Sequence, residues 1–229
     1  MSGQLSVRRA AGTLLDLLFP PRCPFCGRLT DSGAAPVCPA CETSLPRIPD
    51  KLSLRQAGGF PCAVTFYYDG VVQEGIHAMK FGKKPWRAGV FGQYLAQTAA
   101  EQLAGEFDAV TFVPISRRRN IQRGFDQSRL LAEAAARSWG VSVVPTLRKI
   151  RHTPPQSTLT DPKARLRNAQ GAYRVTDPRR VEGRRFLLID DVVTTGSTLS
   201  ACAGALLAAG AASVVCAALA GGQKPDRPA

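Results

Sequence analysis

The chain has 229 residues, enough for one α/β domain of roughly 150 residues and a small additional module. Hydrophobic residues make up 45% and charged residues 21% of the sequence, which excludes a disordered, collagen-like or disulfide-dense chain. The formal net charge of +13, from 30 Lys and Arg against 17 Asp and Glu, favours a negatively charged partner or ligand, such as a nucleic acid, a phosphorylated metabolite or an anionic lipid.

The first 50 residues are rich in Pro and Cys, contain no long periodic segment and end in a proline-containing linker at residues 45–50. Near the N-terminus, two arginines precede an apolar stretch, as they do in a secretory signal peptide. Asp16 interrupts that stretch and no small-residue cleavage site precedes Phe19, so we interpret it as a short amphipathic helix. We therefore expect a module at residues 1–50, a domain at residues 51–229 and a cytoplasmic protein.

Four of the seven cysteines form two close pairs. The pairs are Cys23-Pro-Phe-Cys26 and, after eleven intervening residues, Cys38-Pro-Ala-Cys41. Each turn directs two thiolates toward one ion, and two turns complete a tetrahedral shell with no open position, as structural metal sites do. Zinc is the preferred metal, although iron fits the same geometry. The remaining cysteines have no partner at a useful spacing and are expected to be buried as small hydrophobic residues: Cys62, Cys202 and Cys216.

From residue 60 onward the hydrophobic pattern alternates between strands and helices. It predicts strands at 63–68, 108–115, 141–147, 185–190 and 213–219. It predicts helices at 71–80, 86–103, 126–139 and 197–209. This alternation is typical of an α/β fold in which helices flank a parallel sheet. An uncharged run at 199–223 has the length of a membrane span, but glycines and β-branched residues divide it into helix, turn and strand, so we expect none.

The segment after residue 185 carries the clearest functional pattern. An apolar strand ends in Asp190 and Asp191, and a helix begins after a run of small residues: Thr194, Thr195, Gly196, Ser197 and Thr198. Backbone N–H groups, hydroxyls and a helix N-terminus suit a phosphate dianion, while paired carboxylates accept hydrogen bonds from a diol or hold a hydrated cation. Helix capping is the alternative, but a cap requires one such residue rather than a run. The pattern therefore indicates a site for a ribose 5-phosphate.

Residues 187–199, LLIDDVVTTGSTL, resemble the phosphoribosyl-diphosphate (PRPP) binding motif of type I phosphoribosyltransferases. Further blocks resemble the ComF/GntX family: LLFPPRCPFCG with CPAC, YDGVVQEGIHAMKFGKKPW, VPISRRRNIQRGFDQSRLLA and RHTPPQSTLTDPKARLRNAQGAY. The resemblance covers roughly residues 14 to 219. Two departures are Asp126, where the family more often has Asn, and Tyr173, where it more often has Phe.

The resemblance implies a type I phosphoribosyltransferase-like fold and a role for each motif. Asp190 and Asp191 would be the catalytic pair that holds the ribose hydroxyls, and the residues from 194 to 198 would bind the 5-phosphate. A diphosphate loop would contain Pro114, Ile115, Ser116 and Arg117. A mobile loop within 149–170 would contain Lys149, Arg151 and Gln156. Mg²⁺ would bridge the diphosphate and ribose oxygens of PRPP.

Nearly all of the net positive charge lies in residues 115–185, which contain about 17 Lys and Arg against about 5 Asp and Glu. Three interpretations remain open: a solvated surface, arginines that bind diphosphate, and a surface for sequence-independent contact with nucleic acid. Diphosphate accounts for only a few of these charges. His77 and His152 are weak catalytic candidates. Lys80 could approach the substrate, but a solvated lysine is the preferred interpretation.

Two hypotheses about function follow. The first is an enzyme that transfers phosphoribose from PRPP to an unidentified acceptor with Mg²⁺. The second, which the family resemblance implies, is a binding module that retains the PRPP pocket and acts with nucleic acid and competence proteins in DNA uptake or processing. No side chain is placed so that it must activate an acceptor. The sequence leaves the acceptor, the oligomeric state, and a role in transformation, gluconate-related transport or salvage open.

Overall fold

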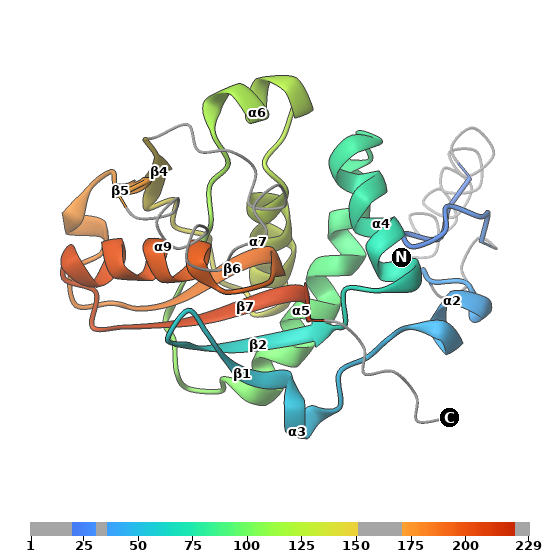
Figure 1. Ribbon diagram of the computed structural model, residues 1–229, viewed down its shortest axis with the longest axis horizontal. Coiled ribbons are helices and arrows are strands. Elements are labelled where there is room, and N and C mark those ends of the chain that lie inside the picture. The colour runs from blue at the N-terminus through green and yellow to red at the C-terminus, as the bar shows by residue number, and fades with distance from the viewer. Residues whose placement is uncertain (1–19, 31–35, 151–170, 223–229) are drawn as a thin grey trace, which may run out of the picture.

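The computed structural model describes residues 20–30, 36–150 and 171–222 and is built around a five-stranded sheet of order β1-β2-β7-β6-β3 (Figure 1). The strands are β1 (Leu54–Ala57), β2 (Phe60–Phe66), β3 (Ala109–Phe112), β6 (Arg185–Val193) and β7 (Ser213–Gly221). The four strands β2, β7, β6 and β3 run parallel, and β1 pairs antiparallel with β2. The expected α/β class with a parallel sheet is confirmed.

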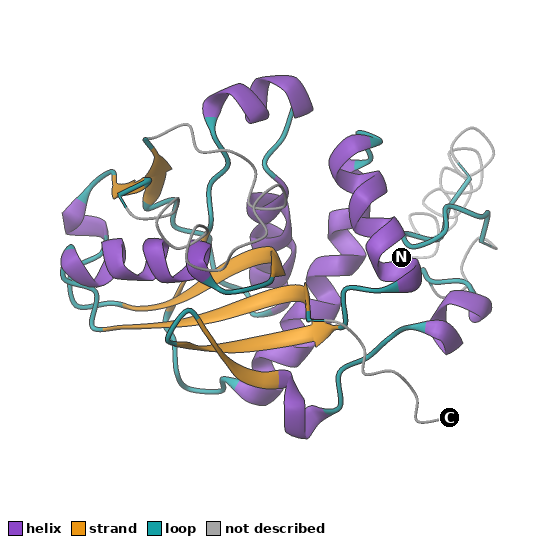
Figure 2. Ribbon diagram, viewed as in Figure 1, coloured by secondary structure: helices purple, strands orange, loops and turns teal. Residues whose placement is uncertain are grey.

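Helices cover both faces of this sheet (Figure 2). The longer ones are α4 (Gly70–Phe81), α5 (Ala88–Gln102), α7 (Gln127–Ser138) and α9 (Ser197–Ala208). Alternate residues of β6 enter different cores: Leu187 and Ile189 pack with α5 and α7, whereas Phe186 and Leu188 pack with α9. Because both faces of the strand are buried, its sequence is a continuous apolar run rather than an alternating one.

Short elements complete the described part of the chain. They are α2 (Pro39–Ser44), α3 (Asp50–Ser53), η1 (Pro85–Arg87), α6 (Arg117–Arg123), η3 (Pro178–Arg180), and an antiparallel pair formed by β4 (Leu147–Lys149) and β5 (Tyr173–Val175). Within the described residues, no helix is long and apolar enough to cross a bilayer.

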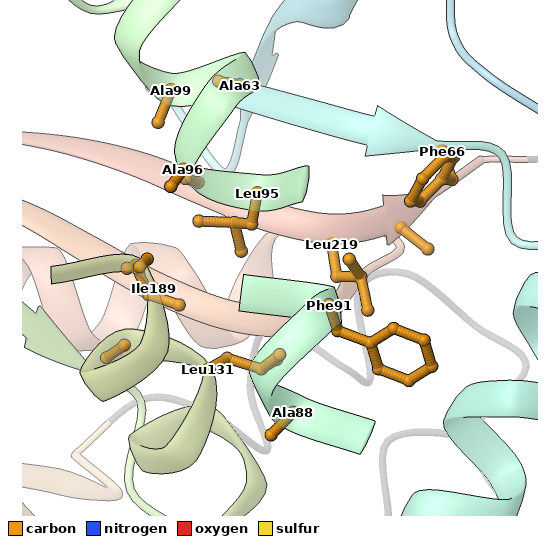
Figure 3. Packing of buried hydrophobic residues seen from close by; sticks show 14 of the residues in the cluster. Ala63, Phe66, Ala88, Phe91, Leu95, Ala96, Ala99, Leu131, Ile189 and Leu219 are labelled. Atoms are coloured by element: carbon orange, nitrogen blue, oxygen red, sulfur yellow. The ribbon is translucent and has the colours of Figure 1, made fainter. Parts of the chain in front are cut away.

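Helix α5 is the centre of the larger core. Figure 3 shows its side chains between the sheet and α7: Ala88, Phe91, Leu95, Ala96 and Ala99. They pack with Leu131 of α7 and with residues of three strands, Ala63, Phe66, Ile189 and Leu219. Gly92 lies where α5 crosses α7, and a Cβ at this position would overlap the Cβ of Ala134. The absence of a side chain at Gly92 therefore permits the close approach of the two helices.

The strand predicted at 141–147 is wrong. In this segment Val143 forms only an isolated parallel bridge with Val110, and β4 begins at Leu147. Pro145 has no N–H group to donate to a ladder, which explains why the apolar run does not continue the sheet. The strand predicted at 108–115 is shorter than expected, because β3 ends at Phe112 before Pro114.

The strand predicted to end at residue 190 continues to Val193, because β7 pairs with β6 as far as Val193 and Gly221. The two aspartates therefore lie inside the strand. The other predicted helices and strands are confirmed with small shifts of their ends. The division of the chain at residue 50 stays a prediction. Cys23, Phe25 and Leu45 belong to the same hydrophobic core as α5.

Candidate functional site

A cavity of about 400 Å³ lies at the carboxyl ends of the parallel strands, where α/β folds commonly bind their ligands. Segments far apart in the sequence form its wall. They contribute Tyr68, Lys80, Phe81, Val113, Pro114, Ile115, Arg119, Arg123, Gln127, Ser128, Lys149, Tyr173, Asp190, Asp191, Val192, Thr194 and Thr198.

The two aspartates of β6 are buried in this wall. Asp190 Oδ1 accepts hydrogen bonds from the Ser128 hydroxyl at 2.9 Å and from the backbone N–H of Asp191 at 2.9 Å. Asp191 Oδ1 accepts one from the backbone N–H of Val192 at 2.8 Å. Burial, followed by the negative charge of Asp191, raises the pKa of Asp190. The site therefore holds two buried carboxyl groups side by side, and the surroundings of Asp190 oppose its ionisation.

Lys80, in the last turn of α4, balances this negative charge. Its Nζ lies 2.5 Å from Asp191 Oδ2, and its side chain is only 18% exposed. Asp191 Oδ2 is buried and has no partner of hydrogen-bond geometry among the described residues, so the lysine supplies its compensating charge. The expectation that Lys80 is solvated is wrong. Its spacing of four residues from the buried Ile76 places both on one face of the helix, which was a usable signal.

Three further cations surround the cavity. Arg119 and Arg123 lie one turn apart on α6, and Lys149 ends β4. The Arg123 guanidinium donates to Gln127 Oε1 and lies 5.4 Å from the ring centre of Phe81. Burial lowers the pKa of both Arg123 and Lys149, because their charged groups lose contact with water where they line the cavity. A ligand with several negative charges would offset that loss.

A smaller cavity of about 50 Å³ adjoins the first at the start of α9. It is lined by Asp190, Val192, Val193, Thr194, Gly196, Ser197, Thr198 and Leu199. Gly196 has φ +75°, and a Cβ on it would overlap the backbone N of Gly58 in the turn between β1 and β2. A Cβ on Gly58 would likewise overlap the carbonyl of Gly196. The turn before α9 is therefore held in place by backbone contact between two glycines, the second of which the sequence did not reveal.

The four expected metal ligands come together away from this cavity. All four Sγ atoms of Cys23, Cys26, Cys38 and Cys41 lie within 4.8 Å of one another. The Cys26 and Cys38 Sγ atoms are 3.7 Å apart. A tetrahedron with Zn–S bonds of about 2.3 Å has edges of about 3.8 Å, so the four sulfurs fit a zinc ion.

Comparison with known proteins agrees with this geometry. Residues 95–229 match the family model described as the phosphoribosyl transferase domain, and residues 14–55 match the double zinc ribbon domain. The chain belongs to the phosphoribosyltransferase domain family. Its relatives include the DNA utilization protein YhgH of Escherichia coli (strain K12), 32% identical over 206 residues and covering 84% of this chain and 86% of that protein.

A second relative is the competence protein ComFC of Bacillus subtilis (strain 168), 30% identical over 193 residues, covering 84% of this chain and 74% of that protein. With its zinc ribbon and these relatives, the chain lies in the ComF branch of the family. A solved structure of the allosteric regulatory enzyme of purine biosynthesis is similar over 58% of this chain and 26% of its own, at 23% identity and a TM-score of 0.40.

The phosphoribosyltransferase domain brings together only part of the predicted diphosphate loop. Pro114 and Ile115 line the cavity. Ser116 instead caps α6, accepting from the N–H of Arg119 at 3.4 Å, and Arg117 is the exposed first residue of that helix. Lys149 lines the cavity. Arg151 and Gln156 lie outside the described residues.

Asp126 does not line the cavity but supports residues that do. Its Oδ2 accepts from the backbone N–H of Ile115 at 2.9 Å, and its Oδ1 caps α7 by accepting from Ser128 and Arg129. One side chain thus ties the loop after β3 to the helix that supplies Ser128. Burial raises the pKa of Asp126.

The zinc ribbon packs directly against the helix that carries Lys80 (Figure 1). A Cβ on Gly75 of α4 would lie 3.3 Å from both the Pro24 carbonyl oxygen and the Phe25 Cα. The buried Arg87 guanidinium donates to the carbonyls of Pro24 and Phe25, the latter at 2.8 Å. The first cysteine turn is therefore clamped between α4 and the start of α5.

Replacing one ligand should release the metal. We expect Cys38→Ser to reduce bound metal from one ion per chain to nearly none and to lower the melting temperature by about 5 °C or more, because binding energy at a closed site is folding energy. Elemental analysis and thermal unfolding measure both. Cys202→Ala is the matched control, since Cys202 is buried in the other core and should leave the metal content unchanged. Full metal retention in Cys38→Ser would contradict the site.

The raised pKa of Asp190 predicts a pH-dependent gain in stability on neutralising this residue. As the pH rises above about 4, the unfolded carboxyl ionises before the folded one, so the wild type loses stability until the folded pKa is passed. Asp190→Asn still accepts the Ser128 hydrogen bond without ionising. We expect it to exceed the wild type by about 1–3 kcal/mol at pH 7, with a difference that shrinks toward pH 4.

Urea unfolding at several pH values measures this difference. Asp177→Asn serves as the control, because Arg179 lowers the pKa of the partly exposed Asp177 and no gain is expected there. A variant less stable than the wild type at pH 7 would show that the Asp190 carboxylate stabilises the fold.

Proposed function

We propose that this protein binds PRPP together with Mg²⁺ and transfers its phosphoribosyl group to an acceptor. The observation that carries the proposal is the pair of adjoining cavities. The smaller one lies at the N-terminus of α9, and the larger one contains a buried carboxylate pair surrounded by cations. A phosphate, a diol and a diphosphate are the three groups that such an arrangement would recognise.

In this proposal each group of PRPP has a place along the wall. The 5-phosphate occupies the smaller cavity, against the backbone N–H groups and hydroxyls from Thr194 to Thr198. The ribose hydroxyls donate to Asp190 and Asp191. The diphosphate faces Arg119, Arg123 and Lys149, whose burial makes their charges more effective than in water.

The donor set is suitable for Mg²⁺. Carboxylate oxygens are the ligands this cation prefers, and Asp191 Oδ2 is a buried oxygen that lacks a partner of hydrogen-bond geometry. When bound through the substrate, Mg²⁺ would neutralise charge on the diphosphate. Asp190 and Asp191 would hold it indirectly, by orienting the ribose oxygens.

The residues of the wall would assist departure of the diphosphate in two ways. The arginines and lysine stabilise the negative charge that develops on the leaving group. Of Asp190 and Asp191, which lie beside the ribose, Asp191 stabilises the positive charge that develops on the sugar ring. They are the only carboxylates among the described cavity residues, so any proton lost by the acceptor passes to one of them or to solvent.

Calorimetric titration with Mg²⁺ and PRPP tests the proposal. We expect the wild type to bind with a dissociation constant in the micromolar range and Asp191→Asn to lose binding while remaining folded, because the ribose hydroxyls lose a charged acceptor. Glu74→Gln, which removes an exposed carboxylate from α4, should bind as the wild type does. A folded, metal-loaded wild type that does not bind PRPP would refute the proposal.

A specific surface favours a second function, contact with single-stranded nucleic acid. Helix α6 protrudes away from the sheet (Figure 1), with Arg117 and Arg118 exposed and Ile121 72% exposed. Phe81, 65% exposed, lies against this helix through Arg123. Guanidinium groups beside an exposed ring suit phosphates and stacked bases without sequence preference. The names of the relatives, which refer to DNA utilization and competence, support this candidate.

Fluorescence anisotropy with a labelled oligonucleotide tests the second function. The double variant Arg117→Gln/Arg118→Gln should weaken binding and flatten the slope of log K against log salt by up to about 1.4, because two phosphate contacts are lost. Arg179→Gln/Arg180→Gln, on η3, removes the same charge from a different exposed site and should have little effect. Equal losses in both double variants would indicate general charge attraction instead of a surface on α6.

A further inference from the structure

Lys80 occupies the part of the cavity that the proposed ligand would enter. Its Nζ lies 2.5 Å from Asp191 Oδ2, whereas Asp191 Oδ1 already accepts from the N–H of Val192. The oxygen that faces Lys80 has no hydrogen-bond partner among the described residues and is therefore the more open acceptor for a ribose hydroxyl. A ligand that binds Asp191 must share this oxygen with the lysine or displace it.

We infer that Lys80 is a ligand-binding residue whose ammonium group pairs with Asp191 in the free protein and moves to a diphosphate oxygen when PRPP binds. This inference rests on the proposed function. It adds a fourth cation to the proposed diphosphate site. It also assigns the buried ion pair a role in ligand binding, whereas such pairs contribute little to stability.

The backbone on the opposite wall does not offer a donor at Ile115. Its N–H group donates to Asp126 Oδ2 at 2.9 Å and is not free for a phosphate oxygen. The cationic side chains that line the cavity are therefore important candidates for the diphosphate contact. Arg123 is engaged with Gln127 and Phe81, and Lys149 lies 5.3 Å from the ring centre of Tyr173. Lys80 differs because its partner, the Asp191 carboxylate, is the group that would accept hydrogen bonds from the ribose.

The position of α4 allows the side chain to move while its backbone stays in place. Gly75 holds the helix against the first cysteine turn, one and a half turns before Lys80. A lysine has a flexible four-carbon stem and three donor hydrogens, so its ammonium group can turn from one acceptor to another nearby. The same features make a bidentate, planar arginine a poorer substitute at this position.

A comparison of two ligands tests the inference. Lys80→Gln and the wild type are titrated with PRPP and with ribose 5-phosphate, each with Mg²⁺. Loss of a charge-assisted hydrogen bond should weaken PRPP binding about 10- to 100-fold. Ribose 5-phosphate lacks the diphosphate, and its affinity should change less than about threefold. Lys84→Gln, which removes an exposed lysine that does not line the cavity, should leave both affinities unchanged.

The other outcomes are equally decisive. Equal losses for both ligands would overturn the inference, because Lys80 would then act only through Asp191. Unchanged PRPP binding in Lys80→Gln would overturn it while leaving the proposed function intact. Absence of PRPP binding in the wild type would refute both. Lys80→Met keeps the length of the stem and provides the same comparison if Lys80→Gln does not fold.

Discussion

Two adjacent carboxyl groups on a central strand impose the strongest constraint on this structure. Asp190 and Asp191 lie on β6, which is paired on both sides, and both residues are buried. Burial of ionised groups is unfavourable unless they are paired and hydrogen-bonded. The compensation comes from Lys80 on α4 and Ser128 on α7. The two carboxyl groups therefore constrain the positions of α4 and α7 at the carboxyl ends of the strands.

The zinc ribbon contributes to the same arrangement. Phe25, within the first cysteine turn, is buried against the rings of Phe66 and Phe91, at centroid distances of 6.0 and 5.1 Å. In the second turn, Glu42 accepts from the Tyr94 hydroxyl at 2.6 Å and pairs with Arg47. The metal module is thus anchored to α5 and rests on α4. A small module without much core of its own gains stability from the ion and from this shared packing.

The arginines of helix α6 divide over two surfaces. On α6, Arg119 and Arg123 are spaced by four residues and line the cavity, whereas Arg117 and Arg118 are exposed. The proposed small ligand and the proposed nucleic acid would therefore contact different faces of the same seven-residue element.

The sequence by itself determined the features that depend on neighbouring residues. The period of apolar residues predicted the helices and most strands, the two CPxC turns predicted the metal site, and the run around Gly196 predicted the turn before α9. These patterns are local, because a helix, a strand or a tight turn is specified within a few residues. The run at 141–147 failed because Pro145 prevents continued pairing, a local signal that apolar content outweighed.

Only the tertiary structure decided which polar groups are buried together. Asp126 reaches Ile115, Ser128 reaches Asp190 across 62 residues, and Gly58 meets Gly196, contacts for which the sequence has no period or motif. Lys80 is the clearest case, since its helix was predicted correctly and its environment was not. The solvation of a charged side chain depends on the elements that pack around it, and those elements come from distant parts of the chain.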